Sequence, residues 1–274
     1  MSTIGKTLGL LEFFSSTTPE IGLSEFARVT GFDKGTLHRH LTSLRDFGFV
    51  EQNPSTKAYR LGPAVLRLAA VREKTVPLLK IVQTYIDRLA SDIQELVHIS
   101  VPQANGASAL YSRDGGQNGT RVWFEEAEIL PYHATSSGLV LLTFGPEELQ
   151  AQNLKAKFKA FTSNTLVARE KILAQIEDTK ARGYARAYGT FENDVHSVAV
   201  PFFDTNACAK GSIAVATPSA RMTAENQRLF TTKLMQTSQK LSQNLGGQIP
   251  PHLSNIWTQF LQGNKPELVQ NSAE

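Results

Sequence analysis

The sequence predicts an α+β protein of two domains: a small helical N-terminal domain that ends in a β-hairpin, and a larger domain in which helices accompany a largely antiparallel sheet. The chain has 274 residues, which is long for one ordinary domain and comfortable for two. Apolar residues recur with a helical period up to about residue 47, after which two short strand-like runs flank a polar turn. Beyond Pro77, helical and strand-like segments alternate with hairpin-length loops.

The composition narrows the class of protein. A hydrophobic fraction of 41% and a charged fraction of 19% suit buried cores rather than a disordered chain. No window approaches roughly 18 uninterrupted apolar residues, and the short apolar stretch 8–14 contains Glu12, unlike a signal peptide. The single cysteine, Cys208, excludes an intramolecular disulfide and a cysteine-based zinc site. We therefore expect a cytoplasmic protein that does not contact a membrane.

The excess positive charge lies in the first quarter of the chain. Residues 1–74 contain ten Lys or Arg and seven Asp or Glu, a net charge of +3, whereas the remaining residues contain 18 of each sign. A basic small domain joined to a neutral larger one is typical of a nucleic-acid-binding module attached to a partner domain.

Two short helices are predicted first. Their apolar side chains recur at helical spacing: Leu8, Leu11, Phe13 and Phe14 within residues 6–15, then Leu23, Phe26 and Ala27 in the second helix. Gly31 is expected to end the second helix, because glycine readily takes the left-handed conformation found after helix C-termini.

The third predicted helix has the strongest pattern. Asp33 is placed to cap its N-terminus and Gly48 to end it. Its expected inward face consists of Leu37, Leu41, Leu44 and Phe47. The polar residues left for its other sides are Lys34, Thr36, His38, Arg39, His40, Thr42 and Arg45.

A β-hairpin is predicted next, with strands over residues 49–52 and 58–61 around the polar turn 53–57. A winged helix-turn-helix has this order of elements: two helices, a tight turn, a long third helix and a hairpin. Its third helix enters a DNA groove, and its wing touches phosphates. The residues expected to contact DNA are Lys34, Thr36, His38, Arg39, Thr42, Arg45, Lys57 and Arg60. The alternative is an amphipathic helix whose polar face is simply solvated.

The chain is predicted to divide into four parts: residues 1–62 as the winged helix-turn-helix, 63–76 as a linker helix, 77–247 as the second domain and 248–274 as a loosely ordered tail. In the second domain the predicted helices are 78–91, 138–144, 146–154, 168–182 and 224–245. The predicted strands are 96–101, 107–111, 121–124, 184–188, 197–203 and 212–217.

Several runs of residues resemble one known family. They are GKTLGLLEFF at 5–14, the stretch LSEFARVTGFDKGTLHRHLTSLRDFGFVEQNPSTKAYRLGPAVLRLA at 23–69, LPYHATSSGLVLL at 130–142, ARGYARAYGTFENDVHSVAVPFFD at 181–204 and GSIAVATPSARMT at 211–223. In this order they resemble the IclR-type transcription regulators over about residues 4–245. The resemblance implies a homodimer or homotetramer on a palindromic double-stranded operator. It also implies a GAF-like C-terminal domain that binds a small effector and needs no cofactor.

The resemblance also implies where the effector pocket lies. Glyoxylate- and pyruvate-type members place an acidic residue, a cysteine and two serines where this sequence has Ala187, Ser197, Ala214 and Ala216. A carboxylate would be received at the start of a helix by Thr135, Ser136, Ser137 and Gly138. An apolar floor with one anion-binding end suits a larger organic acid, such as an aromatic one, better than a two-carbon acid. The alternative is that Ala214 and Ala216 only pack the sheet, with the pocket elsewhere or vestigial.

Other candidate residues point to no catalytic site. The spacings of His98, His133 and His196 match no metal-ligand motif, and Cys208 has no obvious base partner. The acidic residues Glu125, Glu126 and Glu128 are expected to be solvated. We therefore expect a ligand-gated DNA-binding regulator and no enzyme. Two alternatives stay open: a regulator that responds to a partner protein, and a small-acid-binding enzyme or sensor whose N-terminal domain only mediates oligomerisation.

Overall fold

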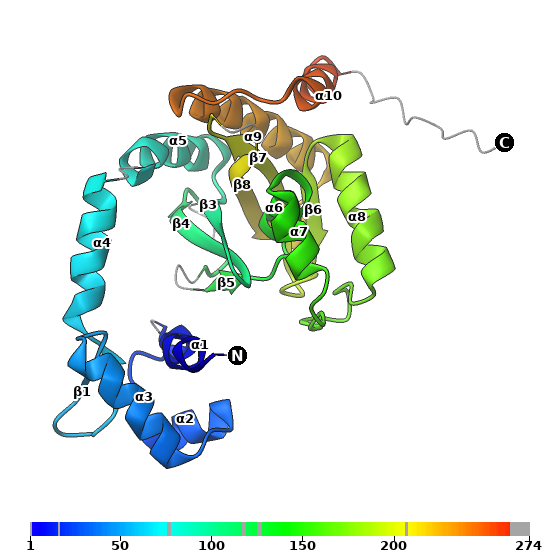
Figure 1. Cartoon of the computed structure of the whole chain (residues 1–274). Coiled ribbons are helices and arrows are strands. Elements are labelled where there is room, and N and C mark those ends of the chain that lie inside the picture. Colours follow the sequence, from blue (N-terminus) through cyan, green and yellow to red (C-terminus); the bar gives the residue numbers. More distant parts are fainter. Residues whose placement is uncertain are drawn as a thin grey trace. The chain divides into compact units, whose positions relative to one another are not determined.

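The computed structural model describes residues 2–15, 17–75, 78–116, 119–124, 128–205 and 208–263. The chain divides into two compact units, Met1–Leu78 and Leu79–Glu274 (Figure 1). Both units mix helices with a sheet, so the predicted α+β class is confirmed. Three residues singled out in the sequence, Pro77, Glu125 and Glu126, lie outside the described residues. No helix in the described part of the chain is long and apolar enough to cross a membrane.

The N-terminal unit has the predicted order of elements. Its helices and strands are α1 Thr3–Leu8, the 3₁₀ helix η1 Gly9–Phe13, α2 Leu23–Thr30, α3 Lys34–Asp46, β1 Val50–Gln52, β2 Tyr59–Leu61 and α4 Pro63–Thr75. Strands β1 and β2 pair antiparallel and form the predicted wing. A glycine ends α2 and an aspartate caps the start of α3, as expected. Gly31 closes α2 with a φ of 71°, and Asp33 Oδ1 accepts the Thr36 N–H at 2.9 Å.

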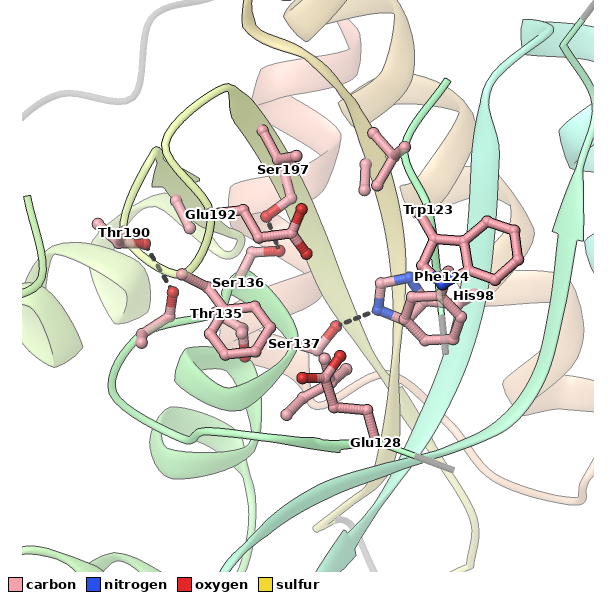
Figure 2. Close-up of a pocket in the computed structure, with 17 residues that line it drawn as sticks. His98, Trp123, Phe124, Glu128, Thr135, Ser136, Ser137, Thr190, Glu192 and Ser197 are labelled. Atoms are coloured by element: carbon pink, nitrogen blue, oxygen red, sulfur yellow. Dashed lines mark hydrogen bonds between the residues drawn. The ribbon is translucent and has the colours of Figure 1, made fainter. Parts of the chain in front are cut away.

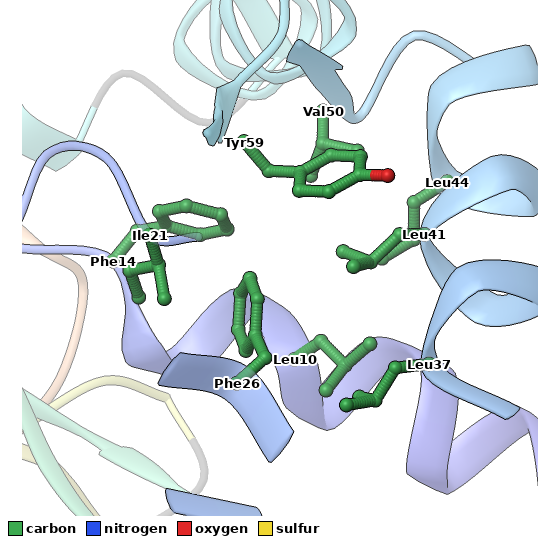
Figure 3. Packing of buried hydrophobic residues seen from close by; sticks show 9 residues of the cluster. All are labelled: Leu10, Phe14, Ile21, Phe26, Leu37, Leu41, Leu44, Val50 and Tyr59. Atoms are coloured by element: carbon green, nitrogen blue, oxygen red, sulfur yellow. The ribbon is translucent and has the colours of Figure 1, made fainter. Parts of the chain in front are cut away.

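One hydrophobic core joins the three helices to the wing (Figure 3). Its buried members are Leu10, Phe14, Ile21, Phe26, Leu37, Leu41, Leu44, Val50 and Tyr59. Tyr59 lies in β2, and its backbone exchanges two hydrogen bonds of 2.9 Å with Ile21, ahead of α2. The wing is therefore fixed to the helical body by both its side chains and its backbone.

Three residues of the predicted apolar faces lie outside this core: Phe47, Leu8 and Phe13, of which Phe13 is the least exposed at 37%. Phe47 is 77% exposed because α3 ends at Asp46, so the chain leaves the helix before the inward stripe reaches Phe47. Leu8 is 48% exposed and Leu10 is buried instead. The physical reason is the change from α-helix to 3₁₀ helix at Gly9, which has three residues per turn and rotates the apolar stripe.

The C-terminal unit is built on one antiparallel sheet of order β5-β4-β3-β8-β7-β6 (Figure 1). The strands are β3 Leu96–Gln103, β4 Gly106–Asp114, β5 Ile129–Leu130, β6 Ala185–Tyr188, β7 Val195–Phe203 and β8 Ala209–Pro218. The helices are α5 Leu78–Ile93, α6 Ser136–Phe144, α7 Glu147–Asn153, α8 Arg169–Arg182, the 3₁₀ helix η2 Ser219–Arg221, α9 Ala224–Asn244 and α10 Pro251–Leu261. The largely antiparallel sheet expected from the sequence is confirmed.

Helices pack on both faces of this sheet. On one face, Ala185, Ala199 and Ala214 form a cross-strand row, and their small side chains let the apolar helix α6 lie close through Leu139 and Val140. On the other face, α9 packs against β7 and β8. Two serines of α9 bond to the β7 backbone: Ser238 Oγ donates to the Pro201 carbonyl and Ser242 Oγ accepts from the Phe203 N–H.

Two predictions in this unit are wrong. Residues 121–124 do not form a strand, and the sheet edge is instead β5. The segment expected as a loosely ordered tail contains α10, in which Leu253 and Trp257 are buried. Trp257 Nε1 donates to the carbonyl of Gly183, the left-handed residue that ends α8, at 2.8 Å. The sequence carries the signal for this helix, because apolar residues recur at helical spacing at Leu253, Ile256, Trp257, Phe260 and Leu261.

Candidate nucleic-acid interface and ligand cavity

The outer face of α3 carries exposed polar side chains, as predicted. Lys34, His38, Arg39 and Arg45 are all exposed. Arg39 reaches back along the helix, and its Nη2 lies 3.4 Å from Thr36 Oγ1. The arrangement leaves Arg39 near the N-terminal half of the helix, the part that reaches base edges in helix-turn-helix proteins.

Two polar residues of α3 lie differently from the expectation. His40 is buried and its Nδ1 lies 2.6 Å from the Thr7 hydroxyl, so it joins α3 to α1. Thr42 is half-buried, and its hydroxyl oxygen is buried with no hydrogen-bond partner among the described residues. The predicted DNA contact by Thr42 stays a prediction. A helical wheel alone could not separate His40 from the exposed side chains, because α1 covers its part of the polar face.

The two predicted wing residues differ in their surroundings. Lys57 is exposed at the turn, in the left-handed region with a φ of 59°. The guanidinium of Arg60 contacts two carboxylates, Glu51 at 2.6 Å and Glu20 at 3.4 Å, and Glu51 is the larger cause of its raised pKa. Glu20 also accepts from Asn53 Nδ2 at 3.0 Å. Arg60 is thus part of the network that holds the wing, whereas Lys57 presents its charge to solvent.

The C-terminal unit contains a cavity between the first turn of α6 and the strands β6, β7 and β8 (Figure 2). It holds about 500 Å³ of space free of atoms, part of it open to solvent. The floor comes from strands β6, β7 and β8, where Ala187, Ser197 and Ala216 are in register across three neighbouring strands. Three of the four predicted floor positions therefore meet in one row.

Two predicted pocket residues do not line this cavity. Ala214 lies one row further along the sheet, fully buried beneath α6. Gly138 is a packing residue, because a Cβ there would lie 2.4 Å from the Tyr132 Cα and 2.6 Å from the Pro131 carbonyl oxygen. Its N–H is also already engaged by the Thr135 hydroxyl at 3.0 Å.

The first turn of α6 forms the polar end of the cavity. Thr135 caps the helix, Ser136 Oγ donates to Ser197 Oγ at 2.8 Å, and Ser137 Oγ lies 2.9 Å from His98 Nε2 (Figure 2). The N–H groups of Ser136 and Ser137 belong to the first turn, where an α-helix offers them no intrahelical acceptor. This end of the helix also carries the positive end of its dipole, so it favours an anion.

His98 is a cavity residue that the sequence did not identify. It lies in β3, stacks on Phe124 with ring centroids 4.7 Å apart, and is buried. Burial lowers the pKa of His98 to about 4, so the imidazole is neutral at physiological pH. The only signal in the sequence is a histidine within an otherwise apolar strand. Among the described residues, no three His, Cys, Asp or Glu side chains gather to hold a metal ion.

The mouth of the cavity also differs from the expectation. Glu128, predicted as part of a solvated loop, is exposed but lines the cavity together with Glu192. The remaining wall is largely aromatic, from Trp123, Phe124 and Phe191. These residues lie in loops between strands and helices, where residue spacing does not predict which side chains face each other.

Comparisons with known proteins agree across both units. The model of the IclR helix-turn-helix domain matches residues 3–54, and that of the bacterial transcriptional regulator IclR C-terminal domain matches residues 72–243. The chain is 26% identical over 245 residues to the HTH-type transcriptional regulator KipR of Bacillus subtilis, covering 89% of this chain and 97% of KipR. It is 24% identical to the Pca regulon regulatory protein of Pseudomonas putida over 249 residues, 90% of this chain and 85% of that protein.

Solved structures show the same fold. A crystal structure of an IclR transcriptional regulator from Silicibacter sp. TM1040 superposes with a TM-score of 0.82 at 37% identity, covering 92% of this chain and 99% of that one. An IclR homologue from Microbacterium hydrocarbonoxydans, complexed with 4-hydroxybenzoate, superposes with a TM-score of 0.70 at 21% identity. That alignment covers 89% of this chain and 99% of the other.

Proposed function

The chain belongs to the IclR family of transcriptional regulators, and from this premise we propose that it binds a palindromic DNA operator as a homo-oligomer, under the control of a small organic acid. The observation that carries the proposal is the exposed basic face of α3 beside the Lys57 turn of the wing. This face lies in the part of the chain that holds the whole net positive charge. The proposal places the protein in the cytoplasm with its DNA, as a regulator and not an enzyme.

DNA recognition is divided between the two elements of this surface. Arg39, on the exposed face of α3, would read base edges in the major groove, where arginine pairs best with guanine. Lys34 and His38 lie on the same exposed side. Lys57 on the wing would contact a phosphate, which positions the domain without reading sequence.

The effector is proposed to occupy the cavity of the C-terminal unit. The N-terminus of α6 offers the N–H groups of Ser136 and Ser137 to a carboxylate, with the hydroxyl of Ser197 alongside. The alanines of the floor suit the apolar body of a larger acid but cannot hydrogen-bond a two-carbon acid. The 4-hydroxybenzoate bound by the Microbacterium homologue is an acid of this larger kind.

Oligomerisation is proposed to use apolar side chains of the N-terminal unit. Leu66 is 75% exposed on α4, and Ile4 on α1 is 72% exposed. Exposed apolar patches of this kind mark interaction surfaces in soluble proteins. A two-fold operator requires a two-fold protein, so a homodimer is the smallest assembly that fits, with a homotetramer built from two of them.

The experiment that tests this function is selection of bound sequences from random double-stranded DNA by the full chain, with and without candidate acids. The expected result is a palindromic consensus whose recovery changes with a larger acid such as 4-hydroxybenzoate. Recovery of no consensus would refute the DNA-binding proposal. A consensus that no acid affects would favour a regulator that responds to a partner protein.

A further inference from the structure

A second hollow of the C-terminal unit lies at the β6 edge of the sheet, beside α8 (Figure 1). This edge crevice, lined in part by Asn164, Gln175 and Arg186, holds about 700 Å³ of space free of atoms, part of it open to solvent. Ala187 and Thr190 line both the crevice and the proposed effector cavity, so the two hollows are neighbours. Their polar groups differ, because the α6 serines line only the cavity and Arg186 lines only the crevice.

The edge crevice has a surplus of positive charge. Among the described residues that line it, Arg186 is the only Lys or Arg and none is Asp or Glu. Its guanidinium lies 5.6 Å from the centre of the Tyr188 ring and pairs with no carboxylate in the described part of the chain. Arg182, which pairs with Asp178, has a pKa lowered first by burial and then by the charge of Arg186. Two guanidinium groups thus lie near each other, and only one of them has a carboxylate partner.

Neutral donors lie around this charge without partners of their own. The side-chain amides of Gln175 and Asn164 make no hydrogen bond to other described residues, although both side chains line the crevice. The segment that carries Asn164 is tied to the end of β6, because Thr162 Oγ1 donates to the Gly189 carbonyl at 2.6 Å. The crevice wall is therefore in place before any ligand arrives, and its amide groups are available to one.

The backbone of β6 adds donors at the same edge. Gly189 donates its N–H to the Val195 carbonyl of β7 at 2.9 Å. Because N–H directions alternate along a strand, those of Arg186 and Tyr188 point away from β7, toward the edge where no described strand follows β6. Neither N–H has an acceptor among the described residues. An open strand edge of this kind offers unpaired backbone groups to whatever binds beside it.

We propose that the edge crevice is a second ligand site, which binds the carboxylate or phosphate group of a small metabolite through Arg186. A guanidinium donates to two oxygens of such a group at once, and the amides of Gln175 and Asn164 are placed to donate to the others. The absence of any carboxylate from the described lining favours an anion over a cation. The inference goes beyond the proposed function, since it does not depend on what occupies the effector cavity.

The test is an amide NMR titration of the full chain at constant ionic strength, with inorganic phosphate and separately with acetate. We expect saturable shifts at residues 164, 175 and 186–188, and the anion that binds more tightly identifies the ligand group as phosphate or carboxylate. Arg186→Gln is expected to weaken binding at least about tenfold. Arg186→Lys should weaken it less, because an ammonium keeps the charge but lacks the planar fork.

The matched control is Arg228→Gln, which removes an exposed arginine that also stacks on an aromatic ring, that of Phe260 at 5.4 Å, outside the crevice lining. This variant is expected to keep the wild-type affinity. No saturable shift with either anion at millimolar concentration, or an unchanged affinity in Arg186→Gln, would overturn the inference. Shifts at α6 that Ser197→Ala abolishes and Arg186→Gln retains would also overturn it, because they would place the anion in the effector cavity.

Discussion

His98 Nε2 and the Ser137 hydroxyl lie 2.9 Å apart in a buried hydrogen bond that joins strand β3 to the first turn of α6. The bond links the sheet that forms the cavity floor to the helix end proposed to receive the carboxylate. It also holds a titratable group where protonation is unfavourable, because burial lowers the pKa of His98 to about 4. The stability of the C-terminal unit should therefore depend on pH.

The pKa of His98 in the folded state is below the unfolded value of about 6.5, so the unfolded chain binds more protons between these two values. The contribution of His98 to the free energy of unfolding is therefore fully present above about pH 6.5 and is lost as the pH falls toward 4. We expect His98 to account for about 2 kcal/mol of lost unfolding free energy between about pH 7.5 and 5. Urea unfolding of the wild type and His98→Gln at both pH values measures this.

His98→Gln keeps a group that can bond Ser137 but does not titrate. The free energy of unfolding of His98→Gln should therefore fall by about 2 kcal/mol less than that of the wild type over this pH range. The pH dependence left in the variant includes that of His133 and His196, whose pKa values burial also lowers. Identical pH dependence in both proteins would show that His98 is accessible to protons in the folded state.

Arg39→Ala is expected to reduce the preference for operator over random DNA. One good base contact accounts for about 1–3 kcal/mol of discrimination, which corresponds to about five- to 150-fold in the ratio of affinities. Competition binding with operator and random duplexes measures the ratio. Arg88→Ala, which removes an exposed arginine from α5 in the other unit, is the control and should leave the ratio unchanged. An unaltered ratio in Arg39→Ala would remove Arg39 from base recognition.

Lys57→Ala is expected to weaken binding to all sequences alike and to lower the slope of log affinity against log salt by about 0.9 per lost phosphate contact. Arg60→Met should lower this slope less, because Glu51 and Glu20 already contact the Arg60 guanidinium. Filter binding over a series of salt concentrations compares the two. If Arg60→Met changed the slope as much as Lys57→Ala, the Arg60 ion pairs would have to open on DNA.

Leu66→Lys is expected to dissociate the proposed dimer, because a charge would replace an apolar side chain that is 75% exposed on α4. Light scattering at micromolar protein concentration measures the mass of the assembly. Leu173→Lys, at a less exposed leucine of α8, is the matched control and should keep the wild-type mass. A wild-type chain that is monomeric yet binds its operator fully would contradict the dimer itself.

The sequence predicted the order of elements because caps and periodicity are local. Asp33 and Gly31 act within one helical turn, so the structure places them as expected. The family resemblance singled out Ala187, Ser197 and Ala216 as pocket positions. The strand register then places the three side by side. His98, Trp123 and Glu192 could not be found in this way, because they meet only through the pairing of distant strands and loops. Phe47 was misplaced because a helical wheel does not show where a helix ends.

An ion pair between the buried Glu95 and the partly buried Arg221 supports one wall of the cavity. Arg221 in η2 binds both oxygens of Glu95, at 2.5 and 2.7 Å, where Glu95 begins the approach to β3. The same guanidinium donates to the Thr120 carbonyl at 3.0 Å, just ahead of the Val122–Phe124 wall. Replacing Arg221 leaves the Glu95 carboxylate buried without its partner.

Arg221→Met is expected to lower the unfolding free energy by about 2 kcal/mol, less than the about 3–5 kcal/mol of a fully buried pair, because the Arg221 side chain retains 27% exposure. The amides of residues 119–124 should also exchange hydrogen faster, since their backbone anchor is lost. Arg28→Met breaks an exposed pair with Glu25 on α2 and should change stability little. Urea unfolding and hydrogen exchange of the three proteins compare these effects. A midpoint for Arg221→Met equal to that of the wild type would show that Glu95 is solvated without its partner.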